Sequence, residues 1–298
     1  MQTTETSFQS PDFSERLQSR HRLGLILGTI FFLATLFSII VLVTLIVDIL
    51  VSGLPWLDWD FLTSYPSRRP QAAGIKSAIV GSLWMMVLTA LIAVPVGIAS
   101  AVYLEEYALR NRFFHLVQVN IANLAGVPSV IYGILGLAFF VRYLSLGRSL
   151  LAGALTMGLL ILPVIIISTQ EALRSVPQGI RESAYALGAT RSQVIWSHLL
   201  PIAAPGILTG VILSLSRAIG ETAPLIMIGA LSFVAFLPGS VLDEFTVLPI
   251  QIFDWTARPQ ADFRSLAAGA IIVLMIILMI MNLTAILLRN YFEKYRPR

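Results

Sequence analysis

Long apolar stretches separated by short polar segments dominate the sequence. Six of them are long enough to cross a membrane, because a hydrocarbon core about 30 Å thick needs about 20 apolar residues in an α-helix. They cover residues 23–48, 77–103, 115–141, 150–169, 203–230 and 265–288. The strict alternation of a membrane β-barrel is absent, so the spans are expected to be helices. The pattern predicts an all-α fold, a polytopic membrane helix bundle with six transmembrane helices.

The composition excludes a water-soluble globule. The chain is 57% hydrophobic and 12% charged, with a mean hydropathy of +0.84, whereas soluble domains carry about 25% charged residues. Residues 1–22 are polar, and no small-residue cleavage site follows the first apolar stretch. That stretch is therefore expected to remain as the first transmembrane helix, 23–48, instead of being removed as a signal peptide.

The basic residues predict an orientation. With both ends inside, the cytoplasmic segments hold twelve Lys and Arg residues and the outer segments hold seven, which favours a cytoplasmic N-terminal tail, 1–22, and a cytoplasmic C-terminal tail, 289–298. The outer segment 231–264 carries Phe236, Phe245, Phe253 and Trp255, and these are expected to form an aromatic belt at the membrane surface.

Several kinds of chemistry are excluded. The chain has no cysteine and three scattered histidines, so no metal site or other cofactor is expected. Neither lysine, Lys76 or Lys294, follows the glycine that a phosphate-binding P-loop requires. The chain is not expected to be an enzyme, and any ATP hydrolysis must occur on a separate subunit. The basic residues cluster at helix ends, where membrane lipid headgroups explain them better than nucleic acid does.

The polar segment 171–201 has the pattern of a short helix–turn–helix. Pro177 suits a first helical turn, and Ile180, Ala184 and Leu187 are predicted to share one apolar face. Gly188 can adopt the left-handed conformation that ends a helix. A second helix is predicted from residue 190 towards 200, with Pro201 opening the fifth span. On periodicity alone, an ordinary interfacial connector is an equal alternative.

The spacing within this segment resembles the EAA loop of ABC importer permeases. Glu182-Ser-Ala184 is followed by Gly188 and then by Leu200-Pro201. The resemblance implies that 171–201 is a coupling loop that docks on an ATPase subunit, with Glu182, Ala184, Gly188 and Pro201 as its marker residues. Ser183 and His198 depart from the usual Ala and apolar residue of that family.

The fifth apolar stretch carries two charges and a polar stripe. Arg217 and Glu221 lie inside it, where a charge is costly unless it faces a partner or a water-filled path. At about 100° per residue, one predicted helical face holds only small or polar residues. That face comprises Gly206, Gly210, Ser214, Arg217, Glu221 and Pro224. Such a helix either lines a pathway or packs tightly, and a purely structural Arg217–Glu221 pair remains an alternative.

Residues 216–225, Ser-Arg-Ala-Ile-Gly-Glu-Thr-Ala-Pro-Leu, resemble the signature of the A-type permeases of phosphate ABC importers. Residues 124–133 and 248–255 also resemble that family. The resemblance implies a type-I ABC importer permease fold, with residues 75–288 as its transmembrane domain in the bacterial inner membrane. It also implies three kinds of protein partner: a homologous second permease subunit, two ATP-binding subunits and an external phosphate-binding protein. Membrane lipid is the further partner expected from the composition.

The same resemblance implies that Arg217 and Glu221 take part in phosphate passage. A guanidinium matches phosphate oxygens with forked donors, and a competing carboxylate would keep binding weak enough for release. Further residues expected on the pathway are Ser214, Thr222, Asn120 and Asn123, although the two asparagines also suit ordinary interhelical hydrogen bonding. The alternatives are a permease for another oxyanion, sulfate or molybdate, and an ion-coupled secondary transporter. The latter would be expected to show inverted repeats, which the sequence lacks.

Overall fold

The structure is a computed structural model that describes residues 13–230 and 233–294. It divides into two compact units, residues 1–51 and 52–298, which are described separately. The first consists almost entirely of α1 (Phe13–Gly53), a helix whose described side chains are mostly apolar and exposed. Part of the predicted tail 1–22 is thus already helical, while residues 1–12 lie outside the described residues.

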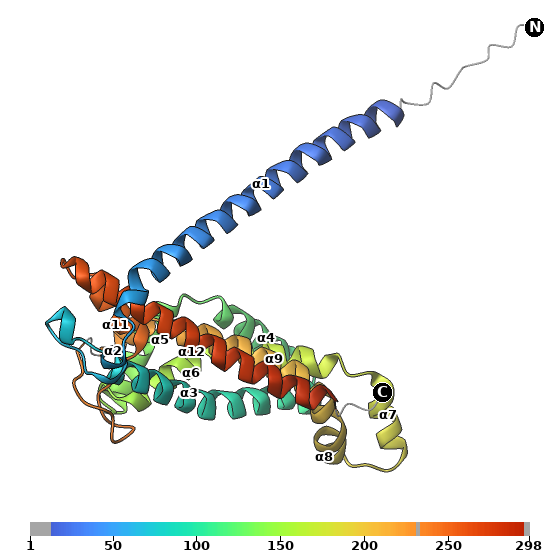
Figure 1. The fold of residues 1–298 in the computed structure, drawn as a ribbon. Helices are drawn as coiled ribbons and strands as arrows, with labels where there is room; N and C mark the ends of the chain where they lie inside the picture. Colours follow the sequence, from blue (N-terminus) through green and yellow to red (C-terminus); the bar gives the residue numbers. More distant parts are fainter. Residues whose placement is uncertain (1–12, 231–232, 295–298) are drawn as a thin grey trace, which may run out of the picture. The chain divides into compact units, whose positions relative to one another are not determined.

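The second unit is a helical bundle (Figure 1). Its long helices are α3 (Lys76–Val102), α6 (Leu150–Arg174), α9 (Leu200–Ile219) and α12 (Ala261–Lys294). Shorter helices complete it: α2 (Trp59–Thr63), α4 (Arg112–Ala125), α5 (Ser129–Gly136), α7 (Gln178–Ala186), α8 (Arg191–Val194), α10 (Ala223–Ile228) and α11 (Leu248–Thr256). Single turns are η1 (Leu54–Trp56) and η2 (Pro70–Ala72), and wider π-helical turns are η3 (Tyr103–Tyr107), η4 (Leu137–Tyr143) and η5 (Ile195–Leu199). The described residues contain no β-strand.

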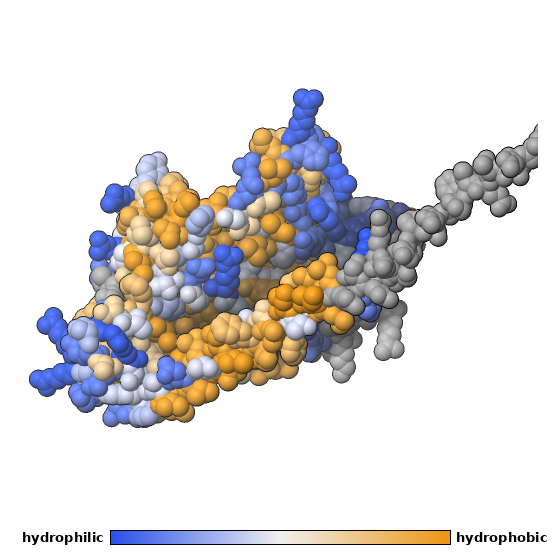
Figure 2. Space-filling view, turned by 90° about the horizontal axis from the view of Figure 1, so that it is seen from above, coloured by the Kyte–Doolittle hydropathy of each residue, from blue (hydrophilic) through white to orange (hydrophobic). Residues whose placement is uncertain are grey.

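Helix α6 forms the centre of this bundle. It packs against α3, α9, α4, α5 and α10, and Met157, Ile161 and Ile165 on it are almost fully buried. The outer surfaces of the bundle stay apolar, and Figure 2 shows broad hydrophobic areas on the face in view. A bundle with an apolar core and an apolar exterior is expected in lipid, where the surroundings are as apolar as leucine.

The prediction of an all-α membrane bundle is confirmed. Among the described residues, five helices are long and apolar enough to cross a membrane. The pair formed by α4 and α5 with its continuation η4 (Ser129–Tyr143) makes a sixth span if it is counted as one. That pair is bent by 103°. Pro128 explains the bend, because a proline disfavours helical geometry in the residue before it. The Tyr132 hydroxyl donates to the Leu124 carbonyl across the bend at 2.7 Å.

The fifth span differs from the prediction at both ends. Helix α9 stops at Ile219, and α10 follows as a separate short helix, so 203–230 is not one continuous helix. Gly220 and Pro224 explain the stop, since proline lacks the N–H that would bond the Gly220 carbonyl. At the other end, α8, η5 and α9 form one uninterrupted helix, Arg191–Ile219. The predicted separate helix over 190–200 is therefore wrong, and Pro201 lies inside a helix.

The end of the bundle opposite α7 and α8 holds α2 and α11 (Figure 1). Phe245 and Trp255, predicted for a surface belt, are instead fully buried there. Trp255 packs against Phe61 and Phe263 with ring centroids 6.1 and 6.3 Å apart. Phe236 and Phe253 are exposed. Residues 231–264 have no regular periodicity, so the sequence did not indicate which of their aromatic side chains would be buried.

The crossing of α6 and α9 depends on glycine. A Cβ atom at Gly210 would overlap the Ser168 side chain, and one at Gly206 would lie 2.8 Å from the Ala172 Cβ. We therefore expect Gly210→Leu to destabilise the folded protein by about 1–3 kcal/mol through overpacking. Thermal unfolding in detergent measures this. Gly28→Leu is the control, because a Cβ at Gly28 meets no atom within 4 Å. The same unfolding temperature for both variants would contradict the close crossing of α6 and α9.

Candidate functional site

Arg217 lies in the last turn of α9, and Glu221 follows the end of that helix. Arg217 Nε donates to Glu221 Oε1 at 3.4 Å, and the side chains are 52% and 19% exposed. Within the described residues, Glu221 is the only ion-pair partner of Arg217. One long hydrogen bond leaves most guanidinium donors available, so this Arg can bind an incoming anion without first breaking a bidentate pair.

The break after α9 lies beside the bend between α4 and α5. Helix α10 packs on α5, and a Cβ on Gly133 would lie 2.7 Å from the Pro224 Cα. Two interrupted helices thus meet next to Arg217. Interrupted helices leave backbone groups without intrahelical partners, and in a membrane such groups occur where protein or a polar cavity covers them.

The other predicted pathway residues lie in different settings. Ser214 is buried and donates to the Gly210 carbonyl of its own helix at 2.8 Å. Thr222 is half-buried at the start of α10. Asn120 and Asn123 are exposed on α4, and Asn120 donates to the Leu116 carbonyl at 2.8 Å. The predicted polar stripe therefore has two parts. Gly206, Gly210 and Ser214 lie where α9 packs closely on α6, whereas the Arg217 side chain is exposed.

The predicted coupling loop forms two helical arms, α7 and α8, at one end of the bundle (Figure 1). Gly188 joins them with a φ of +82°, the left-handed conformation predicted from the sequence. Thr190 starts α8 with a capping box, in which its side chain and that of Gln193 each bond the other's backbone N–H. The turn is thus fixed by a glycine on one side and a helix cap on the other.

The faces of α7 differ from the prediction. Ala184 is buried against the core that includes Val194 and Ile195. Leu187, predicted on the same face, is 89% exposed. The reason is that Leu187 follows the last residue of α7, where the chain turns towards Gly188. Glu182 and Pro201 are exposed, so Glu182 and Leu187 are accessible to a partner and Ala184 is not.

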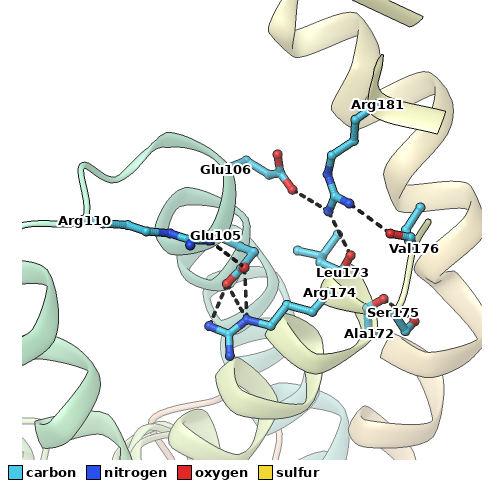
Figure 3. Close-up of polar contacts among 9 residues, drawn as sticks. All are labelled: Glu105, Glu106, Arg110, Ala172, Leu173, Arg174, Ser175, Val176 and Arg181. Carbon is cyan, nitrogen blue, oxygen red and sulfur yellow. Dashed lines mark hydrogen bonds and ion pairs between the residues drawn. The ribbon is translucent and has the colours of Figure 1, made fainter. Parts of the chain in front are cut away.

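A cluster of ion pairs beside this loop was missed from the sequence. Glu105 and Glu106 lie on the π-helical turn η3, at the end of α3. Glu105 pairs with Arg174 at the end of α6, and Glu106 pairs with Arg181 on α7 (Figure 3). The partners are 69 and 75 residues apart, which no helical periodicity can reveal. Two adjacent carboxylates at the end of an apolar span were the available signal.

No group of three or more His, Cys, Asp or Glu side chains in the described ranges could hold a metal ion.

Comparison with known proteins gives a consistent result. Residues 93–295 match the family described as binding-protein-dependent transport system inner membrane component. The chain is 35% identical to the phosphate transport system permease protein PstA of Mycobacterium leprae, over 85% of this chain and 84% of the relative. It is 31% identical to PstA of Xylella fastidiosa, over 93% and 97%. A probable ABC transporter permease protein of Bacillus subtilis, YqgI, is 30% identical over 82% and 87%.

Solved structures agree on the fold. A chain of a bacterial ABC transporter involved in the import of the acidic polysaccharide alginate superposes with a TM-score of 0.67 at 17% identity, over 93% of this chain and 99% of that chain. The MetNI methionine ABC transporter gives a TM-score of 0.58 at 18% identity, over 74% and 94%. The predicted ABC importer permease fold is confirmed.

The positive φ of Gly188 generates a prediction for the loop. Gly188→Val should cost about 1–3 kcal/mol locally, because a β-branched residue resists this conformation. Trypsin should then cut faster at Arg181 and Arg191 in the solubilised protein. Gly188→Asn should have a smaller effect, since Asn tolerates left-handed geometry. Gly179→Val is the control, because a Cβ at Gly179 is unobstructed; unchanged cleavage in Gly188→Val would refute the prediction.

Proposed function

The chain belongs to the family of binding-protein-dependent transport system inner membrane components, and from this premise we propose that it is the permease subunit of an ATP-driven importer of inorganic phosphate. Relatives named as phosphate transport permeases match it over most of their length. The single observation that supports phosphate as the substrate is the half-exposed guanidinium of Arg217, which lies beside two helix breaks. Membership of this family argues against the ion-coupled secondary transporter.

The chemistry of Arg217 and Glu221 suits passage of an oxyanion. Phosphate is attracted by the fixed positive charge and accepts forked hydrogen bonds from the guanidinium. Glu221 already occupies one donor at 3.4 Å. It would compete with phosphate for Arg217 and so prevent the ion from being trapped, since conduction requires binding that is favourable yet weak enough for exit.

The proposed orientation places α7 and α8 in the cytoplasm, together with both termini. The excess of Lys and Arg in these segments supports it. On that side, α7 and α8 would dock on ATP-binding subunits, which would supply the hydrolysis. A second, homologous permease subunit and an external phosphate-binding protein complete the proposed complex. A solved relative of the same fold was determined with a periplasmic protein bound to an alginate pentasaccharide.

Substitutions at Arg217 test the proposal. Arg217→Gln should abolish ATP-dependent uptake of radiolabelled phosphate while the complex still assembles, because Gln stays polar but carries no charge. Arg217→Lys should retain part of the uptake, since an ammonium keeps the charge and loses the fork. Arg258→Gln is a matched control: Arg258 forms a comparable i, i+4 pair with Asp254, at 2.7 Å, in the segment after α11, and its loss should leave uptake near the parent level.

The double variant Arg217→Gln/Glu221→Gln separates substrate contact from a structural pair. A structural pair predicts that removing both charges restores uptake, and such recovery, with equal membrane abundance by immunoblot, would refute substrate contact. Unlabelled sulfate and molybdate identify the ion. If unlabelled sulfate or molybdate inhibits the uptake of labelled phosphate as strongly as unlabelled phosphate does, the permease accepts oxyanions in general and the assignment to phosphate is wrong.

A further inference from the structure

The ion-paired cluster beside the coupling loop has no part in the function proposed above. It joins three elements: the turn η3 that ends α3, the last turn of α6, and the first arm of the loop, α7 (Figure 3). Arg174 Nε donates to both oxygens of Glu105 at 3.0 Å. Arg181 Nη2 donates to Glu106 Oε1 at 3.0 Å. The loop is therefore connected to two spans by side chains as well as by the backbone.

Both carboxylates of the cluster are buried. The Glu105 and Glu106 side chains are 7% and 10% exposed. A carboxylate removed from water is costly unless a cation and hydrogen bonds compensate it. Removing one partner of a buried pair leaves the other charge uncompensated, which is far more damaging than losing an exposed pair. Arg181 is 15% exposed, so the Glu106–Arg181 pair is buried on both sides and should stay closed in the folded protein. Arg174 is 54% exposed, so the Glu105–Arg174 pair is buried on the carboxylate side alone.

Their consecutive positions on a helical turn explain why two neighbouring carboxylates contact two different elements. Consecutive side chains on a helical turn point in different directions, and here Glu105 pairs with Arg174 of α6 and Glu106 with Arg181 of α7. A π-turn inserts an extra residue into the helix and commonly marks a functional position. The main chain turns away directly afterwards, at Ala108.

Arg181 also binds the end of α6. Its Nη1 donates to the Val176 carbonyl at 3.0 Å and its Nη2 to the Leu173 carbonyl at 2.9 Å. The Leu173 carbonyl lies in the last turn of α6, where it also accepts from the Val176 N–H at 3.3 Å, and the Val176 carbonyl lies just beyond that helix. Carbonyls at the C-terminal end of a helix favour a cation. One side chain of α7 thus contacts both α6 and η3.

Few apolar contacts hold α7. Of its nine residues, Ala184 is buried and Ile180 packs half-buried against the same core, and a helix this short is marginal in isolation. Arg181 precedes Ala184 by three residues, so both lie on the inward face. The outward face, which includes Glu182 and Tyr185, is exposed.

We propose that Glu106 and Arg181 form a latch that fixes α7 to the ends of α3 and α6. A displacement of α7 by a docked partner is then passed into both spans instead of moving α7 alone. Glu105 and Arg174 keep the two span ends together so that they move as one. These are positioning residues, and the inference rests on the proposed function because it assumes a partner that moves α7.

The first test measures phosphate transported per ATP hydrolysed by the complete complex in proteoliposomes. Glu106→Gln keeps the size of the side chain and removes its charge, and should lower this ratio roughly fivefold while ATP hydrolysis continues. Arg110→Gln is the matched control, because Arg110 lies 3.9 Å from Glu105 and is 78% exposed; it should leave the ratio unchanged. The parent complex is measured first, so a parent that hydrolyses ATP without moving phosphate contradicts the proposed function separately.

The second test restores the attachment by another bond. The chain has no cysteine, so Glu106→Cys and Arg181→Cys can be joined by a short, reducible thiol cross-linker in a complex whose partners also lack cysteine. The ratio should be low in the reduced double variant and recover on cross-linking. Two results would overturn the proposed latch. In one, the double variant without the cross-link transports as much phosphate per ATP as the parent; in the other, this ratio stays low after cross-linking. Failure of both variants to assemble would also overturn it, because the pair would then serve folding and not transmission.

Discussion

Every backbone N–H and C=O inside a membrane must find a partner within the protein, because lipid offers none. This constraint determines the architecture: long helices α3, α6, α9 and α12 satisfy the requirement internally, and α6, which is packed on several sides, organises the others. Departures from regular helix are consequently informative. The bend before Ser129, the break after Ile219 and the three π-turns lie where neighbouring elements pack.

The candidate site results from those departures. Two breaks from different parts of the sequence meet because glycine permits close approach, as Gly133 does against Pro224. Arg217 sits at the edge of that contact with one long bond to Glu221. A charge in the middle of a regular span would need a buried partner, whereas Arg217 lies at the end of α9 and is 52% exposed. The polar stripe predicted on α9 has two roles: its first part packs on α6, and Arg217 remains open.

The sequence was sufficient for features that depend on local composition. Apolar run length predicted the spans, and the position of Gly188 predicted its left-handed conformation. Features that depend on which side of a segment meets the bundle were not predictable: Ala184 and Leu187 share a helical face by spacing, yet one is buried and the other exposed. Gly220 and Pro224 were the signals for the helix end at Ile219, but the continuous hydropathy of residues 203–230 led to the prediction of one unbroken span. Pairs such as Glu106–Arg181 depend on tertiary proximity, which one sequence does not contain.

The uninterrupted helix from Arg191 to Ile219 has a mechanical consequence. At 1.5 Å per residue, about 40 Å separates its start in the proposed coupling loop from Arg217 near its end. A rod of that length works as a lever, so a tilt of about 3° at the loop displaces the far end by roughly 2 Å. Such a displacement is comparable to the length of a hydrogen bond and would change which oxygen the guanidinium reaches. The same helix therefore connects the turn proposed for docking with the charge proposed for anion binding, and its length turns a small tilt at one end into a larger displacement at the other.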